Sequence, residues 1–301
     1  MKQLKEIIDV EDERPIASLM LDSRLAAENS LFFCIEGLTV DGHDFVEDAI
    51  KNGAIAIVHR KPLLHKHDDV YYHQVEDVES VLHQAANAFY DYPSQNMYVY
   101  GITGTNGKST IMKTVKNILL KMGVKAGYIG TISVEYGEHV FEPSLTTPDI
   151  ITLNTWLSKM REEGITDVCL EVSSQGLAMR RVDGIDFDLA AFTNLTHDHL
   201  DYHKTMENYF EAKKILFDRL DKEKPMFINM DDPYGKRLVN AYSNQAVTYG
   251  VDLPADYRAK DVEIHEDYTS YILEHKGIEY EVKTNLLAYF NMFSHRLKVK
   301  F

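Results

Sequence analysis

The fold is decided at residues 104–110, which have the sequence Gly-Thr-Asn-Gly-Lys-Ser-Thr. Residues 97–103 are mostly apolar and β-branched, and residues 109–122 carry apolar side chains at helical spacing before Gly123, a predicted helix C-cap. A strand, a glycine-rich turn and a helix in this order can hold a phosphate, because backbone N–H groups converge in the turn and the helix N-terminus is partially positive. We therefore predict a phosphate-binding loop formed by Gly104, Thr105, Asn106, Gly107, Lys108, Ser109 and Thr110.

The expected ligand of this loop is ATP with Mg²⁺. Lys108 is expected to reach the β- and γ-phosphates, and the hydroxyl group of Ser109 or Thr110 can bind the metal ion. The strict Walker spacing requires glycine where this chain has Ile102, so the loop is a variant of that motif. Such a turn can also be no more than a helix cap, but its strand–turn–helix setting favours nucleotide binding.

A connector at residues 92–96, rich in proline and small polar residues, separates two patterns of predicted structure. Before it, short strand-like runs and one helix predict a small α/β domain at residues 1–95. After it, strands at residues 97–103, 125–132, 167–172, 189–195 and 226–229 alternate with helices at residues 109–122, 149–163, 206–220 and 233–242. This alternation predicts a mostly parallel sheet in a P-loop domain at residues 96–288, with a small antiparallel extension at residues 248–282. The predicted fold class is therefore α/β.

Composition limits the classes of partner. The 301 residues carry a formal charge of −15, from 47 acidic and 32 basic side chains, which argues against binding to nucleic acid or an anionic membrane. No apolar run approaches the roughly 20 residues that span a bilayer, and the first residues lack the apolar core of a secretory signal. Cys34 and Cys169 lie in apolar runs, which favours buried free thiols. We expect a cytoplasmic protein that acts on small molecules.

A second group of chemically active residues follows the predicted strands. Glu171 ends an apolar strand, where a carboxylate near the phosphate loop can bind Mg²⁺ or orient water, or can serve only the structure. Residues 197–203 contain three histidines and two aspartates, and His199 and His203 have the helical spacing of a zinc-binding pair. Magnesium beside nucleotide phosphates fits better than zinc, although histidine is an unusual ligand for so hard an ion.

The chain resembles the Mur ligases, the ATP-dependent amide-bond synthetases of peptidoglycan assembly, and most of all the MurE type. The phosphate loop resembles theirs, including its departure from Walker spacing. Further matching segments occur in family order along nearly the whole chain: Asp22-Ser23-Arg24, Asp41-Gly42-His43, Thr146-Thr147-Pro148-Asp149, residues 171–177 with Arg181, and residues 192–203 leading into residues 209–217.

The resemblance implies a substrate side of the site that binds UDP-N-acetylmuramoyl-L-Ala-D-Glu. Ser23 matches a contact to the uridine. Thr146 and Thr147 match residues that hold the UDP-muramoyl group, and Ser173 and Arg181 match residues that hold the muramoyl peptide and its carboxylates.

The resemblance also implies a two-metal ATP side. Ser109 matches a ligand of the first Mg²⁺, and Glu171 and His199 match ligands of the second. Lys213 matches a lysine that the family carbamoylates with CO₂, which turns an ammonium group into an anion that can bind Mg²⁺. Asn229 matches a contact to the adenine.

The implied reaction adds the third amino acid, L-Lys or diaminopimelate, through an acyl phosphate formed from ATP, with Lys108, Lys213, Glu171 and His199 as its catalytic residues. The expected oligomeric state is a monomer. Two alternatives stay open: a ligase similar to folylpolyglutamate synthase, which shares the central ATPase domain, and a non-catalytic remnant that binds ATP or a UDP-sugar.

The sequence departs from the family at two places. Gln175 stands where the family usually has histidine, and residues 288–294 alter a segment that leads into a third domain in the family. Residues 289–301 are expected to be an aberrant basic tail, with the C-terminal ligase domain absent. We therefore expect ATP binding with weak or no ligation by the chain as given.

Overall fold

The structure is a computed structural model that describes residues 1–37 and 40–285, and the chain divides into two compact units. The first unit comprises Met1–Pro93, Asp149–Lys159 and Asp183–Ile185, and the second contains the other described residues. The predicted domain boundaries stay a prediction, since the first unit takes in two segments from the predicted second domain. The predicted tail and the altered segment at residues 288–294 lie outside the described residues.

The first unit is built on a four-stranded parallel sheet in the order β3-β4-β5-β6. Its strands are β3 Ser18–Met20, β4 Ser30–Phe33, β5 Ala54–His59 and β6 Tyr71–Gln74, and β1 Lys2–Gln3 pairs separately with β2 Pro15–Ile16. Its helices are α1 Val46–Lys51, α2 Val78–Phe89 and the short η1 Leu4–Glu6, η2 Ser23–Leu25, η3 Gly42–Phe45 and η4 Pro93–Asn96, the last of which begins at the unit boundary.

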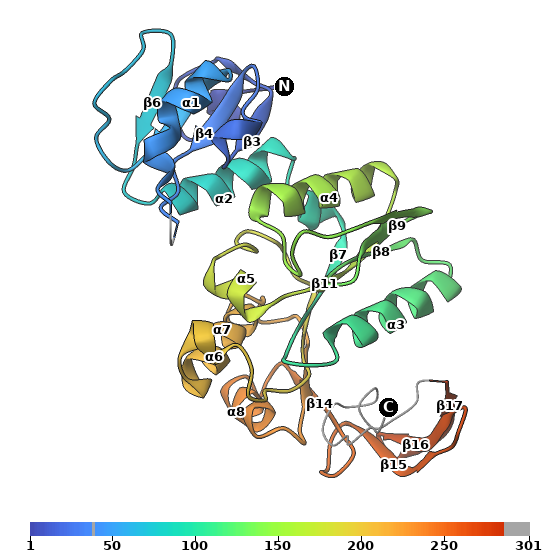
Figure 1. The fold of residues 1–301 in the computed structure, drawn as a ribbon. Coiled ribbons are helices and arrows are strands. Elements are labelled where there is room, and N and C mark those ends of the chain that lie inside the picture. The colour runs from blue at the N-terminus through green and yellow to red at the C-terminus, as the bar shows by residue number, and fades with distance from the viewer. Residues whose placement is uncertain (38–39, 286–301) are drawn as a thin grey trace. The chain divides into compact units, whose positions relative to one another are not determined.

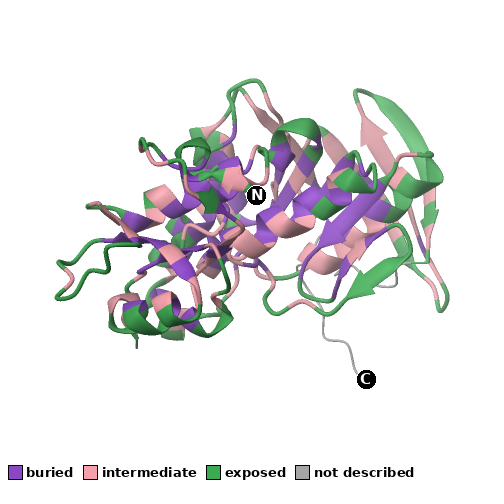
Figure 2. Ribbon diagram, turned by 90° about the horizontal axis from the view of Figure 1, so that it is seen from above, coloured by how far each residue is buried: buried purple, intermediate pink, exposed green. Residues whose placement is uncertain are grey.

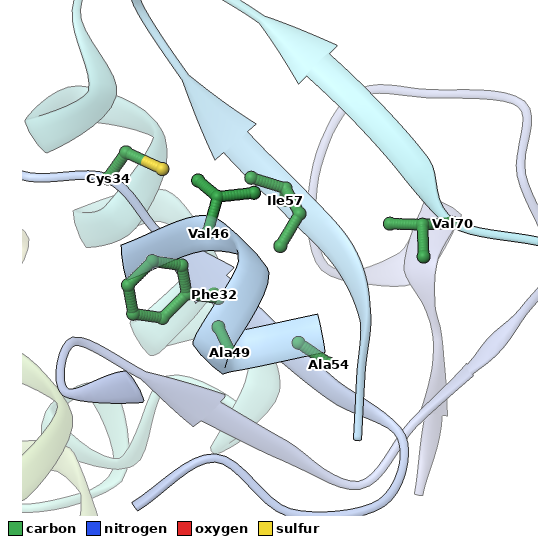
Figure 3. Packing of buried hydrophobic residues seen from close by; sticks show 7 residues of the cluster. All are labelled: Phe32, Cys34, Val46, Ala49, Ala54, Ile57 and Val70. Carbon is green, nitrogen blue, oxygen red and sulfur yellow. The ribbon is translucent and has the colours of Figure 1, made fainter. Parts of the chain in front are cut away.

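The core of this unit lies between α1 and the parallel sheet. Figure 3 shows side chains from the sheet strands and from α1 packed together, with the Cys34 thiol among them. The cluster contains Phe32, Cys34, Val46, Ala49, Ala54, Ile57 and Val70. Apolar residues on successive strand positions are buried in this way because crossover helices cover a parallel sheet.

The second unit contains an eleven-stranded sheet in the order β10-β9-β8-β11-β7-β12-β13-β14-β15-β16-β17. The parallel strands are β7 Tyr98–Thr103, β8 Ala126–Ile129, β11 Asp167–Glu171, β12 Leu189–Phe192, β13 Met226–Asn229 and β14 Ala246–Gly250. Antiparallel strands complete the two ends: β9 Val134–Tyr136, β10 His139–Phe141, β15 Tyr257–Ile264, β16 Thr269–His275 and β17 Ile278–Thr284.

Helices connect the parallel strands of this unit (Figure 1). They are α3 Lys108–Lys121, α5 Ser174–Ala178, α6 Leu200–His203, α7 Met206–Asp218 and α8 Pro233–Ala241, while α4 Ile150–Glu162 is divided between the units. Side chains on α3 pack on the sheet around Ile102, Met112, Tyr128 and Cys169. Figure 2 shows the buried residues concentrated on the strands and on one face of the helices.

Strand β7 lies between β11 and β12, and the register aligns their carboxyl ends. Glu171 on β11 is opposite Ile102, and Phe192 on β12 is opposite Thr103. The turn that follows β7 is therefore flanked by the residues that follow β11 and β12. A crevice outside the carboxyl ends of parallel strands is where this class of sheet binds ligands.

Two predicted strands end earlier than expected, and the predicted antiparallel extension begins later. Strand β8 stops at Ile129 and β12 at Phe192, since the chain turns before the apolar run is finished. The antiparallel extension begins at Tyr257 rather than at residue 248, because β14 pairs in parallel with β13. None of the described helices combines the length and apolar character that a membrane crossing requires.

Candidate active site

The predicted phosphate loop forms the turn between β7 and α3. Gly104 and Gly107 have φ of 147° and 86°, values that glycine adopts at little cost. Lys108, the first residue of α3, turns back so that its Nζ donates to the carbonyl oxygens of Gly104 and Thr105 at 3.0 Å each. Burial lowers the pKa of Lys108, and the charges of Glu171 and Asp198 oppose that shift. A cationic group is thus already in place beside the turn.

The segment that follows β12 holds the loop in shape. The Thr105 N–H donates to the Asn194 carbonyl oxygen at 2.8 Å, and the Asn106 N–H donates to Asn194 Oδ1 at 3.1 Å. In return, Thr193 Oγ1 donates to the Asn106 carbonyl oxygen at 2.7 Å. The conformation of the loop therefore depends on residues that lie almost ninety positions later in the chain.

Gly104→Ala is expected to weaken nucleotide binding by more than about 10-fold, because a Cβ at position 104 would lie 1.8 Å from Thr193 Oγ1. The added atom must push Thr193 away from the loop or move the loop itself. Gly123→Ala is the matched control, since Gly123 also has positive φ, 82°, but nothing lies within 4 Å of its added Cβ. Calorimetric titration with ADP measures both variants, and equal affinities would contradict this account of the loop.

Lys213 on α7 meets the same turn from the other side. Its side chain is 1 % exposed, and its Nζ donates to the Gly104 carbonyl oxygen at 2.8 Å and lies 4.5 Å from the centre of the Tyr209 ring. Burial lowers the pKa of Lys213 well below its usual range, and the nearby charge of Lys108 lowers it further. Burial therefore acts against the charged form of this side chain.

A pocket of about 120 Å³ opens above the turn, within the second unit. Four of its lining residues come from the predicted ATP side: Gly104, Lys108, His199 and Lys213. Four come from the predicted substrate side: Thr146, Thr147, Ser173 and Arg181. Leu145, Ser174, Gln175 and Tyr209 complete the lining. The structure thus gathers eight of the sixteen predicted site residues around one space.

The substrate-side residues differ in what their polar groups contact. Thr147 is completely buried, and its hydroxyl donates to the Glu171 carbonyl oxygen at 3.0 Å and accepts the Ser173 N–H at 2.9 Å. Arg181 Nη1 donates to the Thr147 carbonyl oxygen at 3.1 Å. Thr147 therefore supports the pocket wall from inside, whereas half-buried Thr146 and Arg181 present polar groups along it.

Glu171 lies next to the pocket rather than in its lining. It is completely buried, Tyr128 donates to its Oε1, and Thr131 Oγ1 donates to its Oε2 at 2.9 Å. A carboxylate has about four lone-pair positions, so two hydroxyl donors leave it able to bind a cation or a water molecule. Ser109 and Glu171 both offer oxygen, the atom type that Mg²⁺ prefers.

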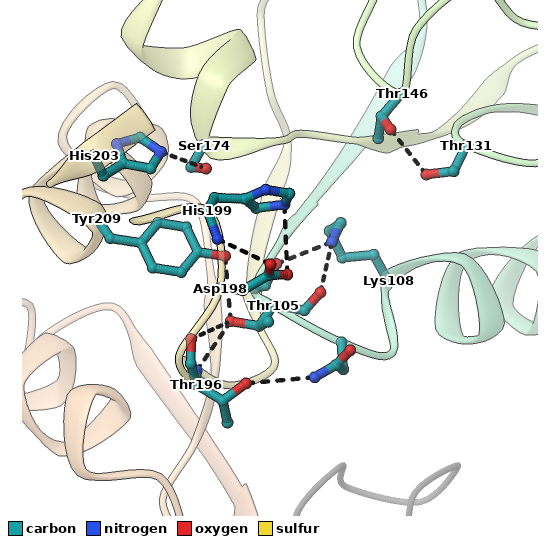
Figure 4. Close-up of polar contacts among 12 residues, drawn as sticks. Thr105, Lys108, Thr131, Thr146, Ser174, Thr196, Asp198, His199, His203 and Tyr209 are labelled. Atoms are coloured by element: carbon teal, nitrogen blue, oxygen red, sulfur yellow. Dashed lines mark hydrogen bonds and ion pairs between the residues drawn. The ribbon is translucent and has the colours of Figure 1, made fainter. Parts of the chain in front are cut away.

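The two histidines of the predicted zinc-binding pair differ in their surroundings. His203 Nε2 lies 2.9 Å from Ser174 Oγ, and its ring stacks on Tyr209, as Figure 4 shows. His199 faces the pocket beside Asp198. Within residues 1–37 and 40–285, no group of three or more His, Cys, Asp or Glu side chains is arranged to hold a metal ion. Mg²⁺ needs only one or two protein carboxylates, because waters and phosphates supply its other ligands.

The residues predicted to contact adenine and uridine, Asn229 and Ser23, also lie outside the pocket lining. Asn229 is completely buried at the end of β13, where its Nδ2 donates to the Thr193 carbonyl oxygen at 2.8 Å and its Oδ1 accepts the Asp231 N–H at 3.0 Å. Ser23 belongs to the first unit and begins η2, after the Asp22 side chain that caps it. Thr110 lies in the first turn of α3, next to Ser109.

Comparison with known families covers most of the chain. Residues 102–293 match the Mur ligase middle domain, and residues 15–90 match the Mur ligase family, catalytic domain. The chain belongs to the Mur ligase family.

Similar proteins agree with this membership. The chain is 40 % identical over 286 residues to UDP-N-acetylmuramoyl-L-alanyl-D-glutamate–2,6-diaminopimelate ligase of Bacillus velezensis, with 93 % of this chain and 58 % of that protein covered. A solved structure of a ligase with the same name is 26 % identical and has a TM-score of 0.84, covering 98 % of this chain and 62 % of that one. An FPGS–AMPPCP complex, 15 % identical with a TM-score of 0.54 over 70 % of this chain, shares the fold alone. The chain spans 58 % of the length of the Bacillus relative.

The Mur ligase site contains two tyrosines that the sequence analysis did not single out. Tyr209 lines the pocket, one helical turn before Lys213 on α7, and that spacing of four residues was a usable signal that they share a face. Tyr128 contacts Glu171 from the neighbouring strand β8. No local pattern predicts this contact, since it depends on how β8 pairs with β11.

Proposed function

We propose that this Mur ligase chain carries the ATP and UDP-muramoyl sites of an amide-bond ligase that adds the third amino acid to UDP-N-acetylmuramoyl-L-Ala-D-Glu. The observation that carries the proposal is the single pocket lined by both Lys108 of the phosphate loop and Arg181 of the predicted substrate side. A phosphate held at the loop and a carboxylate held near Arg181 would then share one small space. A cytoplasmic setting and a monomeric state remain parts of this proposal.

The proposed chemistry has two steps. An oxygen of the D-Glu side-chain carboxylate attacks the γ-phosphorus of ATP, the bond to the β-phosphate oxygen breaks, and ADP leaves behind an acyl phosphate. The amine of the incoming amino acid then attacks the acyl carbon, loses a proton, and expels inorganic phosphate. Lys108 would offset the charge on the transferred phosphoryl group, and the rigid loop would align it for attack.

Magnesium would be held at Ser109 and at Glu171 with His199, where it would neutralise phosphate charge. Oxygen atoms of Ser109 and Glu171 suit this ion, and His199 faces the same pocket. The burial of Lys213 supports the proposed carbamate. Reaction with CO₂ requires a neutral amine, and burial lowers the pKa of this lysine. The carbamate would supply an anion beside the phosphate loop.

Phosphate release from ATP tests the proposed function. We expect UDP-N-acetylmuramoyl-L-Ala-D-Glu to increase phosphate release by the full chain at least about 10-fold, since phosphoryl transfer depends on a positioned carboxylate. UDP-N-acetylglucosamine, which has the nucleotide sugar but no peptide carboxylate, is the matched control and should not stimulate release. Diaminopimelate is the first amino acid to add, because the Bacillus relative is named for it, and L-lysine is the comparison.

The same assay separates the alternatives. Binding of both nucleotides without stimulated release would favour the non-catalytic remnant. Absence of UDP-muramoyl binding, with ATP still bound, would favour a ligase similar to folylpolyglutamate synthase. The likeness to the FPGS complex covers a smaller share of this chain than the likeness to the diaminopimelate ligase structure, which supports the order in which we rank them.

A further inference from the structure

A network of hydroxyl groups converges on the buried carboxylate of Glu171. Tyr128, which is completely buried on β8, donates its hydroxyl hydrogen to Glu171 Oε1. Thr131, two residues after the end of β8, donates to Glu171 Oε2 at 2.9 Å. A carboxylate only accepts hydrogen bonds, so it determines the direction of both bonds.

The Tyr128 ring is held in the core between α3 and the sheet. It packs with Ile102, Met112 and Cys169. Its hydroxyl group therefore approaches Glu171 from a fixed direction.

The hydrogen bonds that begin at Glu171 continue through Thr131 to Thr146. Thr131 Oγ1 and Thr146 Oγ1 are 3.0 Å apart, and the hydrogen of Thr131 is already donated to Glu171. Thr146 must then donate to Thr131, and its own oxygen is left as an acceptor on the pocket wall. Figure 4 shows the Thr131–Thr146 contact on the side of the pocket opposite His203.

We infer that Tyr128 is a positioning residue for the magnesium–nucleotide site, which orients the Glu171 carboxylate so that its remaining lone pairs face a bound cation. The inference rests on the proposed function, in which Glu171 binds Mg²⁺. Without the Tyr128 hydroxyl, Glu171 loses one of the two donors that hold its carboxylate plane.

Calorimetric titration of the full chain with the non-hydrolysable ATP analogue AMPPCP tests this, in saturating MgCl₂ and separately in EDTA. Tyr128→Phe should weaken AMPPCP binding about 10-fold in MgCl₂, the range found when a partner of a metal ligand is removed. Its affinity in EDTA should stay within about 2-fold of the unsubstituted chain, because the phosphate loop itself is untouched. A residue with a merely structural role would change both affinities together.

Two variants serve as comparisons. Tyr100→Phe removes a hydroxyl that lies 2.5 Å from Asp167 Oδ1, near the opposite end of strands β7 and β11, and should change neither affinity. Thr131→Val removes the other donor to Glu171, so it should also weaken AMPPCP binding in MgCl₂ and leave the affinity in EDTA nearly unchanged. Thermal unfolding of each variant without ligand reports whether it is folded.

The outcomes separate this inference from the proposed function. Equal AMPPCP affinities in MgCl₂ and EDTA for the unsubstituted chain would overturn the proposed metal ligands and this inference with them. A magnesium effect that survives Tyr128→Phe undiminished would overturn the role of Tyr128 alone. An equal loss in MgCl₂ and in EDTA would assign Tyr128 a structural role and also overturn it.

Discussion

Lys108→Met is expected to lower stimulated phosphate release by about 100-fold or more, because a cation aimed at developing phosphate charge contributes that much to phosphoryl transfer. The ammonium group is already held by the carbonyl oxygens of Gly104 and Thr105, so little reorganisation is needed when a phosphate enters. Methionine keeps the length of the side chain and removes the charge. Stability should not fall, because burial already lowers the pKa of Lys108, and an apolar side chain suits that position.

Lys121→Met is the matched control, since Lys121 lies exposed at the last residue of the same helix. It should leave phosphate release within about 2-fold, because an exposed charge so distant from the turn is screened. ADP titration accompanies the rate measurement and should show weaker binding for Lys108→Met alone. A Lys108→Met variant with undiminished phosphate release would show that another group supplies the charge.

Lys213→Met is expected to abolish most phosphate release while making the chain more stable. Replacing a buried ionisable side chain by an apolar one of similar size is often stabilising by about 1 kcal/mol or more. The Gly104 carbonyl oxygen keeps the hydrogen bond from Lys108, so the substitution does not leave that acceptor unpaired. The melting temperature should rise by about 2 °C or more, and phosphate release should fall by about 100-fold or more.

Lys214→Met is the neighbouring control. Lys214 pairs with Asp218 at 2.9 Å along the outside of α7 and does not line the pocket. Its loss should leave phosphate release nearly unchanged and should not raise the melting temperature. A ¹³C carbamate resonance with ¹³CO₂ should appear in the unsubstituted chain and vanish in Lys213→Met. Persistence of that resonance in the variant, or full activity of the variant, would contradict the assignment.

Much of the site could be predicted from local sequence. The turn at residues 104–110 has its chemistry built into adjacent residues, so its glycines, Lys108 and the start of α3 follow directly from the pattern. Glu171 could be placed at the end of a strand because the apolar run stops there. Their proximity also follows, since carboxyl ends of parallel strands lie at one edge of a sheet.

Other roles could not be assigned from the pattern. Thr147 and Asn229 stay predicted contacts to the substrate and to adenine; the structure adds that both are completely buried and that their polar groups bond within the protein. Tyr128 carried no local signal, yet its hydroxyl donates to the Glu171 carboxylate. Side-chain direction and hydrogen-bond partners depend on which strands become neighbours, and that information is spread over the whole chain.

The sequence by itself determined the α/β class, the phosphate loop and the type of residue at each strand end, because these depend on spacing within a few residues. Only the tertiary structure decided that Lys213 donates to the Gly104 carbonyl oxygen, 109 positions away in the chain, and that its side chain is buried away from solvent there. The order β11-β7-β12 is the physical reason. Placing β7 between two strands that come later in the chain surrounds the phosphate loop with residues from distant segments, and burial then changes their chemistry.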